Sequence, residues 1–194
     1  MQEKIKSELN QHLEVIHALH NNSEWISTLH RISEECIRCL RGGGKILLCG
    51  NGGSAADAQH IAAELSGRYM LDRDPLFVEA LHVNTSYLTA VANDYDFSEV
   101  FSRAILAKGR PGDILIGLST SGTSPNVIKA FTAAKKQGMH TVAFTGMREN
   151  SLGQQADFCL KVPSSETPRI QEIHILFGHM LCLMIEDALF GNKV

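Results

Sequence analysis

Two stretches of the chain carry side chains that could transfer protons or bind a metal ion. His60 and Glu64 lie four residues apart in a stretch of helix-forming composition, so they share one helix face. Gln171 and His179 are about two helical turns apart in a later stretch, which also contains His174. Imidazole nitrogens together with carboxylate or amide oxygens suit zinc. Spacing alone leaves open whether Gln171 and His179 or His174 would complete such a site. A His–Glu pair four apart is also common as a plain surface interaction.

Two turns rich in glycine or hydroxyl groups predict a bound phosphate. The first, residues 49–54 (Cys-Gly-Asn-Gly-Gly-Ser), follows a buried apolar run and precedes a helix; we call it the first cradle. The second, residues 119–125 (Ser-Thr-Ser-Gly-Thr-Ser-Pro), has the same position between a strand and a helix; we call it the second cradle. Glycines bring the backbone close to a ligand, and helix starts offer free N–H groups to anions. A serine-rich loop with one capping residue is the simpler interpretation of the second cradle alone, and two cradles in one sheet favour a phosphorylated ligand.

Neither cradle has a known nucleotide-binding pattern. Gly-x-Gly-x-x-Gly is absent from both, and so is the Gly-Lys-Ser/Thr of a Walker A loop. The cradles therefore favour a phosphorylated ligand without matching either of these two nucleotide-binding motifs.

Alternating strands and helices must hold these groups in place. Periodicity and capping residues predict helices over 3–20, 24–41, 55–69, 85–92, 98–108, 125–136 and 168–190, and strands over 45–49, 76–83, 114–118, 140–144 and 158–162. Most of the strands are apolar on both faces, which is typical of a parallel sheet covered by helices on both sides. Ligands of such sheets bind at the carboxyl ends of the strands, where both cradles lie, so the cradles can share one cleft.

The first two helices, residues 1–41, precede every strand. Their apolar faces, which include Ile5, Leu9 and Leu13, are larger than one sheet face needs. We expect part of this surface to pack against another subunit.

Composition limits the other possibilities. The chain has 194 residues, the length of one domain, and a net charge of −3 with no basic patch, so nucleic acid is not an expected partner. No apolar run is expected to span a bilayer, and the polar start does not resemble a signal peptide, so we expect a cytoplasmic protein without a membrane partner. Five cysteines, an odd number, do not suggest a disulfide framework.

Several motifs in order resemble a known family. Residues 49–69, 92–95, 119–122 and 169–174 are similar to the signature of the bacterial sedoheptulose-7-phosphate isomerases, also called phosphoheptose isomerases, of the sugar isomerase (SIS) domain family. The resemblance covers essentially the whole chain, 1–194, as one SIS domain. It implies a flavodoxin-like three-layer α/β fold with a five-stranded parallel sheet, and a homotetramer with active sites at subunit interfaces. It also implies conversion of sedoheptulose 7-phosphate to glycero-manno-heptose 7-phosphate, the first step towards the ADP-heptose of lipopolysaccharide.

The resemblance also implies the site residues. One zinc ion per subunit would be held by His60, Glu64, Gln171 and His179. The substrate contacts would come from Asn51, Gly52, Gly53, Glu64, Asn93, Asp94, Ser119, Thr120, Ser121, Ser124 and Gln171, with Arg68 as a further candidate. Moving a proton between C1 and C2 of a sugar needs a base and an acid, which we assign to Glu64 and His179. Many relatives have a glycine-rich stretch where this chain has residues 147–152, so the shape of that loop is not predicted.

Two other functions compete with this one. Relatives of the same fold serve as scaffolds that bind the bacterial replication initiator, or as phosphosugar sensors, and need not keep the catalytic set. The complete set of four zinc-binding candidates favours the enzyme. A phosphosugar isomerase acting on a pentose or hexose phosphate is a smaller possibility, since sugar length depends on the depth of the cleft.

Overall fold

Five parallel strands form the centre of the molecule. The computed structural model describes residues 1–191, and its strands lie in the order β2-β1-β3-β4-β5. In this register Leu48 pairs with Ala80 on one side and Ile116 on the other. The strands are β1 (Ile46–Gly50), β2 (Val78–Ala80), β3 (Ile114–Ser119), β4 (His140–Gly146) and β5 (Phe158–Val162). This confirms the expected five-stranded parallel sheet.

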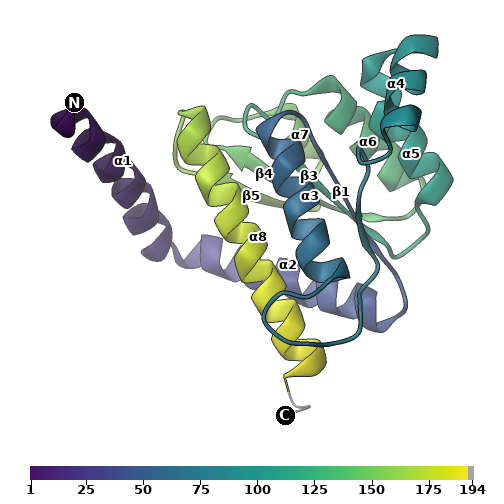
Figure 1. Cartoon of the computed structure of the whole chain (residues 1–194), viewed down its shortest axis with the longest axis horizontal. Helices are drawn as coiled ribbons and strands as arrows, with labels where there is room; N and C mark the ends of the chain where they lie inside the picture. Colours follow the sequence, from purple (N-terminus) through teal and green to yellow (C-terminus); the bar gives the residue numbers. More distant parts are fainter. Residues whose placement is uncertain (192–194) are drawn as a thin grey trace.

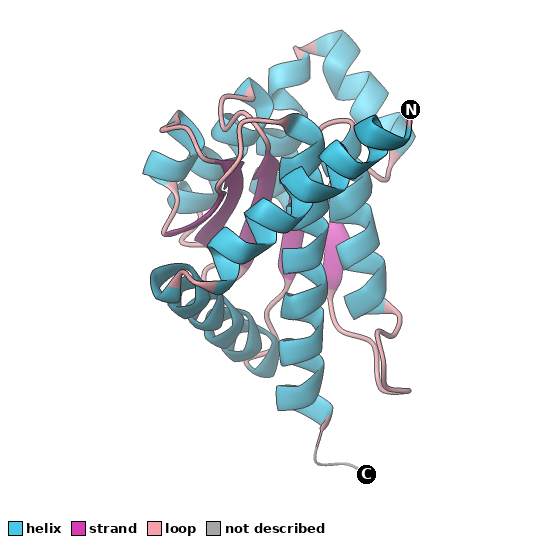
Figure 2. Cartoon of the chain, turned by 90° about the vertical axis from the view of Figure 1, so that its left-hand side faces the viewer, coloured by secondary structure: helices cyan, strands magenta, loops and turns pink. Residues whose placement is uncertain are grey.

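Helices cover both faces of the sheet (Figures 1 and 2). One face packs against apolar side chains of α2, α3 and α8, and the other against those of α4, α5, α6 and α7. The end of α1 joins the first of these layers through Val15 and Leu19. The helices are α1 (Gln2–His20), α2 (Ser23–Arg41), α3 (Gly53–Ser66), α4 (Thr85–Asp94), α5 (Val100–Lys108), α6 (Pro125–Lys136), α7 (Ser151–Gln155) and α8 (Thr167–Phe190), with a 3₁₀ turn, η1 (Phe97–Glu99), before α5. The result is the three-layer α/β architecture that the sequence predicts.

The strand order places both cradles at one point of the sheet. From β1 the chain continues to β2 on one side and then returns to β3 on the other, so the order reverses between β1 and β3. The first cradle follows β1 and the second follows β3. Open α/β sheets bind ligands outside the carboxyl ends of the strands at this kind of reversal.

The boundaries of several elements differ from the predicted ones. α3 begins directly at Gly53 and ends at Ser66, because the backbone turns at Gly52 with a φ of 55° and stops again at Gly67. The second strand is only three residues long. The helix predicted from residue 98 starts as the turn η1, and its N-cap is Asp96, whose carboxylate accepts a hydrogen bond from the Ser98 N–H.

α8 is a long apolar helix of the core. By length and composition alone it could cross a membrane, whereas no membrane-spanning run was expected from the sequence. Its apolar side chains Ile173, Phe177 and Leu181 are instead fully buried in the core beneath the sheet. Core helices of soluble proteins can be equally long and apolar, so length and composition are weak evidence for a membrane span.

α1 stands apart from the rest of the molecule. Figure 1 shows it extending away from the sheet beside the start of α8. Only Val15 and Leu19 of this helix are buried, whereas Ile5, Leu9 and Leu13 are each more than half exposed. The apolar face that the sequence predicts is therefore real, and most of it remains uncovered in one copy of the chain.

Candidate active site

Three of the predicted polar side chains meet between α3 and α8. His60 Nε2 lies 3.0 Å from Glu64 Oε1 and 3.4 Å from His179 Nε2. The two helices approach closely because Gly178 packs against Ile61, where a Cβ would lie 2.4 Å from the isoleucine side chain. The His60 and Glu64 side chains keep 49% and 26% of their surface exposed, so the group is open to a ligand.

Gln171, the fourth predicted zinc ligand, lies at the first cradle. It lies on α8 about two turns before His179, and its amide packs on Gly53 at the start of α3. A Cβ at position 53 would lie 2.6 Å from Gln171 Nε2, so only glycine leaves room for this contact. The amide is thus placed at the cradle by a close approach of side chain to backbone.

His174 does not take part. It is completely buried against Phe144 and Phe177, and its Nε2 lies 3.4 Å from the Thr145 carbonyl oxygen. Burial lowers the pKa of His174 to about 4, although its contact with that carbonyl acts in the opposite direction. Of the two alternatives that spacing left open, the structure brings His179 and not His174 to the exposed group.

The donor atoms fit a zinc ion. Two nitrogens bound to one tetrahedral zinc at about 2.0–2.1 Å would lie about 3.4 Å apart, which is the spacing of His60 Nε2 and His179 Nε2. Two imidazoles and a carboxylate are also ligands that zinc accepts. Among residues 1–191, however, no three His, Cys, Asp or Glu side chains already surround a common point suited to a metal ion. The group therefore suits zinc in the kinds of its donor atoms and in the spacing of its two imidazole nitrogens.

The second cradle is held open by its own hydrogen bonds. Ser119 Oγ accepts the Gly122 N–H at 3.1 Å and lies 3.0 Å from Ser124 Oγ. Ser121 Oγ accepts hydrogen bonds from the N–H and hydroxyl of Thr123. Gly122 has a φ of 65°, and a Cβ there would lie 2.1 Å from the side chain of Asn150. Ser124 is the N-cap residue of α6 but makes no side-chain capping bond, which leaves its hydroxyl available in the cradle.

An amide pair joins the two cradles. Asn51 Nδ2 donates to Asn126 Oδ1 at 2.9 Å, and Asn126 Nδ2 donates to Asn51 Oδ1 at 2.8 Å. Asn51 belongs to the first cradle, and the buried Asn126 lies in the first turn of α6, directly after the second. Asn126 was not among the predicted site residues, because nothing in the local pattern marks an asparagine whose partner is 75 residues away.

Three further candidates lie at the edges. Asn93 and Asp94 are exposed in the last turn of α4, where the Asn93 amide donates to the Asp94 carboxylate at 2.9 Å. Arg68 is exposed just after α3. Within residues 1–191 none of these three side chains forms a hydrogen bond with His60, Glu64 or His179. Their role in binding the substrate therefore stays a prediction.

Two residues beside the site were not predicted. Asp57 lies one turn before His60, and its Oδ2 atom is buried without a hydrogen-bond partner in the described part of the chain. Burial raises the pKa of Asp57, and nearby His60 acts in the opposite direction. Tyr69 stacks on His179 with ring centroids 5.9 Å apart. Both lie inside the motif of residues 49–69, so only their roles were missed.

The loop that the sequence left open borders a pocket beside the second cradle. β4 ends at Gly146, and Asn150 caps α7 by accepting the Gly153 N–H at 2.8 Å. A cavity of about 400 Å³ lies there, lined by Thr120, Ser121 and Arg148 among others.

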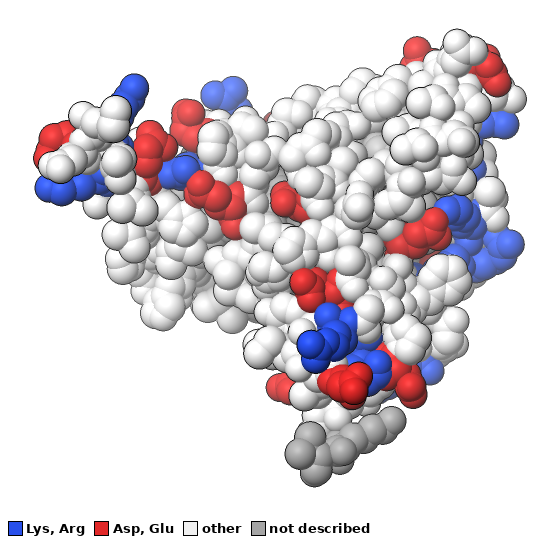
Figure 3. Space-filling model, viewed as in Figure 1, with Lys and Arg blue, Asp and Glu red and all other residues white. Residues whose placement is uncertain are grey.

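Figure 3 shows basic and acidic side chains intermixed in small groups on the face seen in Figure 1, without a broad basic area.

The fold and the cradles define a class of proteins. Residues 10–146 match the model of the SIS domain. This segment contains both cradles and the His60–Glu64 pair. The chain is therefore an SIS-domain protein.

Similar proteins define the class more narrowly. The phosphoheptose isomerase of Sulfurimonas denitrificans is 48% identical over the full length of both chains, and that of Rhodospirillum rubrum is 56% identical over 77% of this chain and 80% of its own. The structure of a phosphoheptose isomerase from Neisseria gonorrhoeae has a TM-score of 0.89 at 42% identity, covering 96% of this chain and 98% of that one. The chain belongs to the phosphoheptose isomerase family and is an aldose–ketose isomerase.

Proposed function

We propose that this enzyme interconverts sedoheptulose 7-phosphate and glycero-manno-heptose 7-phosphate. The observation that carries the proposal is the meeting of Glu64 and His179, through His60, on α3 and α8. The same two helices bring Gln171 onto the first cradle, which is joined to the second at the reversal point of the sheet. A base and an acid on the elements that also form a phosphate site suit a phosphosugar isomerase. The phosphoheptose isomerases to which the chain is similar support the heptose as the sugar. The reaction would then be the first step towards the ADP-heptose of lipopolysaccharide.

The reaction transfers one proton between neighbouring carbons. In the proposed sequence Glu64 removes the proton from C1 of the ketose, the C1–C2 double bond of an enediol forms, and His179 gives a proton to the former carbonyl oxygen on C2. His179 then takes the proton from the oxygen on C1, and Glu64 returns its proton to C2, which produces the aldehyde. Ser119, Ser121 and Ser124, together with backbone N–H groups, hold the phosphate at the second cradle.

We propose that His60, Glu64, Gln171 and His179 hold one zinc ion. When bound, such an ion supplies polarisation of the carbonyl and stabilisation of negative charge on oxygen. The facing nitrogens of His60 and His179, 3.4 Å apart, support this assignment. Glu64 and His179 each have two tasks in this scheme, because a carboxylate that binds a cation is a weaker base and an imidazole nitrogen that binds one carries no proton. Loose binding by Glu64 would reconcile its tasks, and His179 would donate its proton from the ring nitrogen that does not face the metal.

Removal of metal is expected to abolish turnover reversibly. The purified protein is assayed with sedoheptulose 7-phosphate before chelation, after chelation, and after zinc is restored, and metal content is measured at each stage. We expect about one zinc per chain and activity that follows it. Conversion that persists at zero metal content would remove the zinc assignment and keep the isomerase. Binding of the phosphosugar without any conversion would favour a scaffold or sensor.

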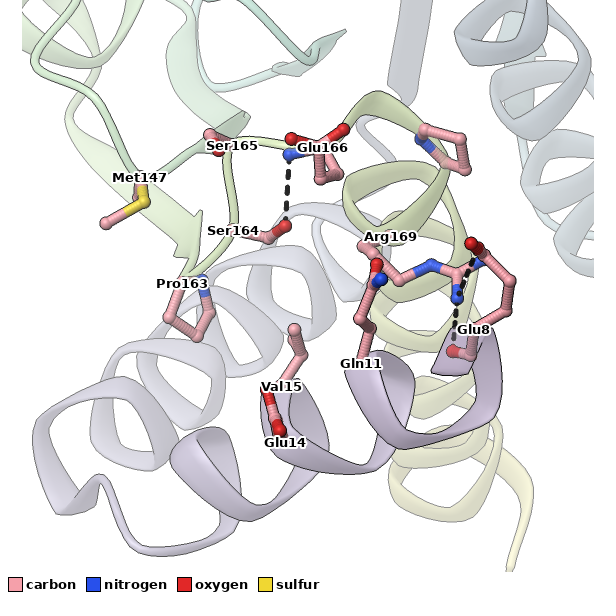
Figure 4. A pocket seen from close by; sticks show the side chains of 11 residues that line it. Glu8, Gln11, Glu14, Val15, Met147, Pro163, Ser164, Ser165, Glu166 and Arg169 are labelled. Carbon is pink, nitrogen blue, oxygen red and sulfur yellow. Dashed lines mark hydrogen bonds and ion pairs between the residues drawn. The ribbon is translucent and has the colours of Figure 1, made fainter. Parts of the chain in front are cut away.

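We also propose that the chain forms a homotetramer through α1 and α2. Polar contacts tie one side of α1 to the start of α8. Arg169 donates to the Glu8 carbonyl oxygen at 2.6 Å (Figure 4). It also donates to the Glu172 carboxylate at 2.5 Å. His12 Nδ1 lies 2.8 Å from the same Glu172. α1 is thereby held in place while its apolar residues remain exposed, which suits a surface that another copy covers.

The charge-introducing change Leu9→Glu is expected to dissociate the assembly. Leu9 is 61% exposed on the apolar face of α1, and a carboxylate there would be buried without a partner in an interface. The mass is measured by size-exclusion chromatography with light scattering. Asn10→Glu is the control, since it places the same charge on the neighbouring exposed position, about 100° around the helix. A monomeric unaltered protein, or a tetrameric Leu9→Glu variant, would contradict the role of α1.

A further inference from the structure

A buried carboxylate on α8 organises the segment that follows α3. Glu186 is 1% exposed and accepts hydrogen bonds from three successive backbone N–H groups, those of Tyr69 at 3.2 Å, Met70 at 2.7 Å and Leu71 at 2.9 Å. Its fourth partner is Arg73 Nε at 3.0 Å. Burial acts to raise the pKa of Glu186, but these hydrogen bonds outweigh it and the pKa is lowered, so the group is a carboxylate at neutral pH.

The arginine extends this network to the end of α3. Arg73 is as buried as its partner. Its Nη2 donates to the carbonyl oxygen of Glu64 at 2.9 Å, and its Nη1 donates to those of Leu65 at 2.8 Å and Gly67 at 3.0 Å. A helix leaves its last carbonyl groups without partners, and a guanidinium group here satisfies several of them at once. One of these carbonyls belongs to the proposed base itself.

The same segment contacts the proposed acid. Glu186 lies seven residues after His179, so the two share one face of α8. Tyr69, whose N–H is bound by Glu186, stacks on the His179 ring with an angle of 25° between the planes. Figure 1 shows the segment after α3 running alongside the C-terminal half of α8. The Arg73–Glu186 ion pair therefore connects both helices that carry the acid–base pair.

We propose that Arg73 and Glu186 are positioning residues, which fix the end of α3 and the Tyr69 ring so that Glu64 and His179 keep their mutual geometry. This inference rests on the proposed roles of Glu64 and His179. A displacement of about 1 Å between reacting groups is enough to slow an enzyme by about 10²-fold, so a clamp outside the site can control kcat.

The variant Glu186→Gln keeps the size of the side chain and removes its charge. We expect kcat to fall at least tenfold, with a smaller change in KM, because the phosphate cradles are not touched. Tyr69→Leu keeps the backbone N–H bond to Glu186 and removes only the ring, and we expect kcat to fall here too, while Tyr69→Phe retains activity. Tyr69→Leu keeps the test valid even when Glu186→Gln folds poorly.

The matched control is Asp113→Asn. Asp113 is a second buried carboxylate, 2% exposed, which accepts hydrogen bonds from the N–H groups of Lys45 and Arg110 and pairs with the Lys45 ammonium at 2.5 Å. It lies just before β3, at the amino ends of the strands, opposite to the cradles. Asp113→Asn should lower thermal stability as Glu186→Gln does, but leave kcat within about twofold.

A second measurement tests the positioning role independently of the proposed reaction. In protein with ¹³C-labelled histidines, the His179 ring signals should shift in Glu186→Gln and stay in place in Asp113→Asn. Tyr69→Leu is judged by kcat alone, because loss of the aromatic ring stacked on His179 changes these signals even where the imidazole does not move. The signals report the surroundings of the His179 ring whatever sugar the enzyme uses. Unchanged His179 signals in Glu186→Gln, together with an unchanged kcat in both Glu186→Gln and Tyr69→Leu, would overturn the positioning role. Shifted signals in a protein inactive on the heptose phosphate would support the clamp and reject the substrate.

Discussion

Glu64→Gln is expected to lower kcat by about 10²–10⁴-fold, the range for loss of a group that transfers a proton. The amide has nearly the same shape, but it cannot accept a proton from carbon. The second cradle is unaltered, so the variant should still bind the phosphosugar. We would measure turnover of sedoheptulose 7-phosphate and, separately, binding by calorimetry.

The chain provides a matched control for this change. His30 and Glu34 on α2 form another His–Glu pair four residues apart, with 3.6 Å between Nε2 and Oε1. Glu34→Gln therefore makes the same chemical change in the same local arrangement, away from the cradles, and should leave kcat unaltered. Turnover within a few-fold of the unaltered protein in Glu64→Gln would exclude Glu64 as the base.

Gly122→Ala is expected to disrupt the phosphate site and to destabilise the protein. The left-handed backbone conformation at this glycine costs an alanine about 1–2 kcal/mol. The new methyl group would in addition lie 2.1 Å from Asn150, which is buried and fixed by its hydrogen bonds to the Arg148 carbonyl and the Gly153 N–H. We expect KM to rise tenfold or more, about 1.4 kcal/mol of binding, and Tm to fall by about 5 °C.

Gly112→Ala is the control that isolates the free-energy cost of the left-handed backbone from the clash with Asn150. Gly112 has a φ of 84°, but a Cβ there would meet no atom within 4 Å, and the turn lies before β3 at the other end of the sheet. This variant should lose some thermal stability and retain its KM. Equal KM values for Gly122→Ala and the unaltered protein would show that the second cradle does not hold the phosphate.

The sequence was informative wherever the signal is local. Apolar strands, glycine turns and helix periodicity lie within ten or twenty residues of each other, so the sheet and both cradles were predicted with boundary errors of a few residues. Likewise, the prediction that His60 and Glu64 share one helix face depends only on the helical repeat. The choice between His179 and His174 was different, because it depends on which side of α8 faces the sheet. The structure buries His174 against two phenylalanine rings.

The connections between distant segments could not be predicted. Asn126 reads as an ordinary first-turn residue of a helix, and Glu186 reads as a polar residue near the end of an apolar one. The partner of Asn126 is the Asn51 amide, 75 residues away in the sequence. The partner of Glu186 is the Arg73 guanidinium, 113 residues away. Such pairs depend on how whole elements pack, and a single sequence contains no periodic signal for them.

The reciprocal amide pair of Asn51 and Asn126 has a thermodynamic consequence. Each amide both donates and accepts, and the Val127 N–H, which donates to Asn126 Oδ1 at 3.0 Å, selects one orientation of the pair. The pair thereby ties the two turns together in the folded protein. The entropy of ordering them is lost once, when the chain folds, and not again with each substrate molecule. Binding energy from the phosphate is then free to hold the sugar carbons against the acid–base pair, where it contributes to the rate of the reaction.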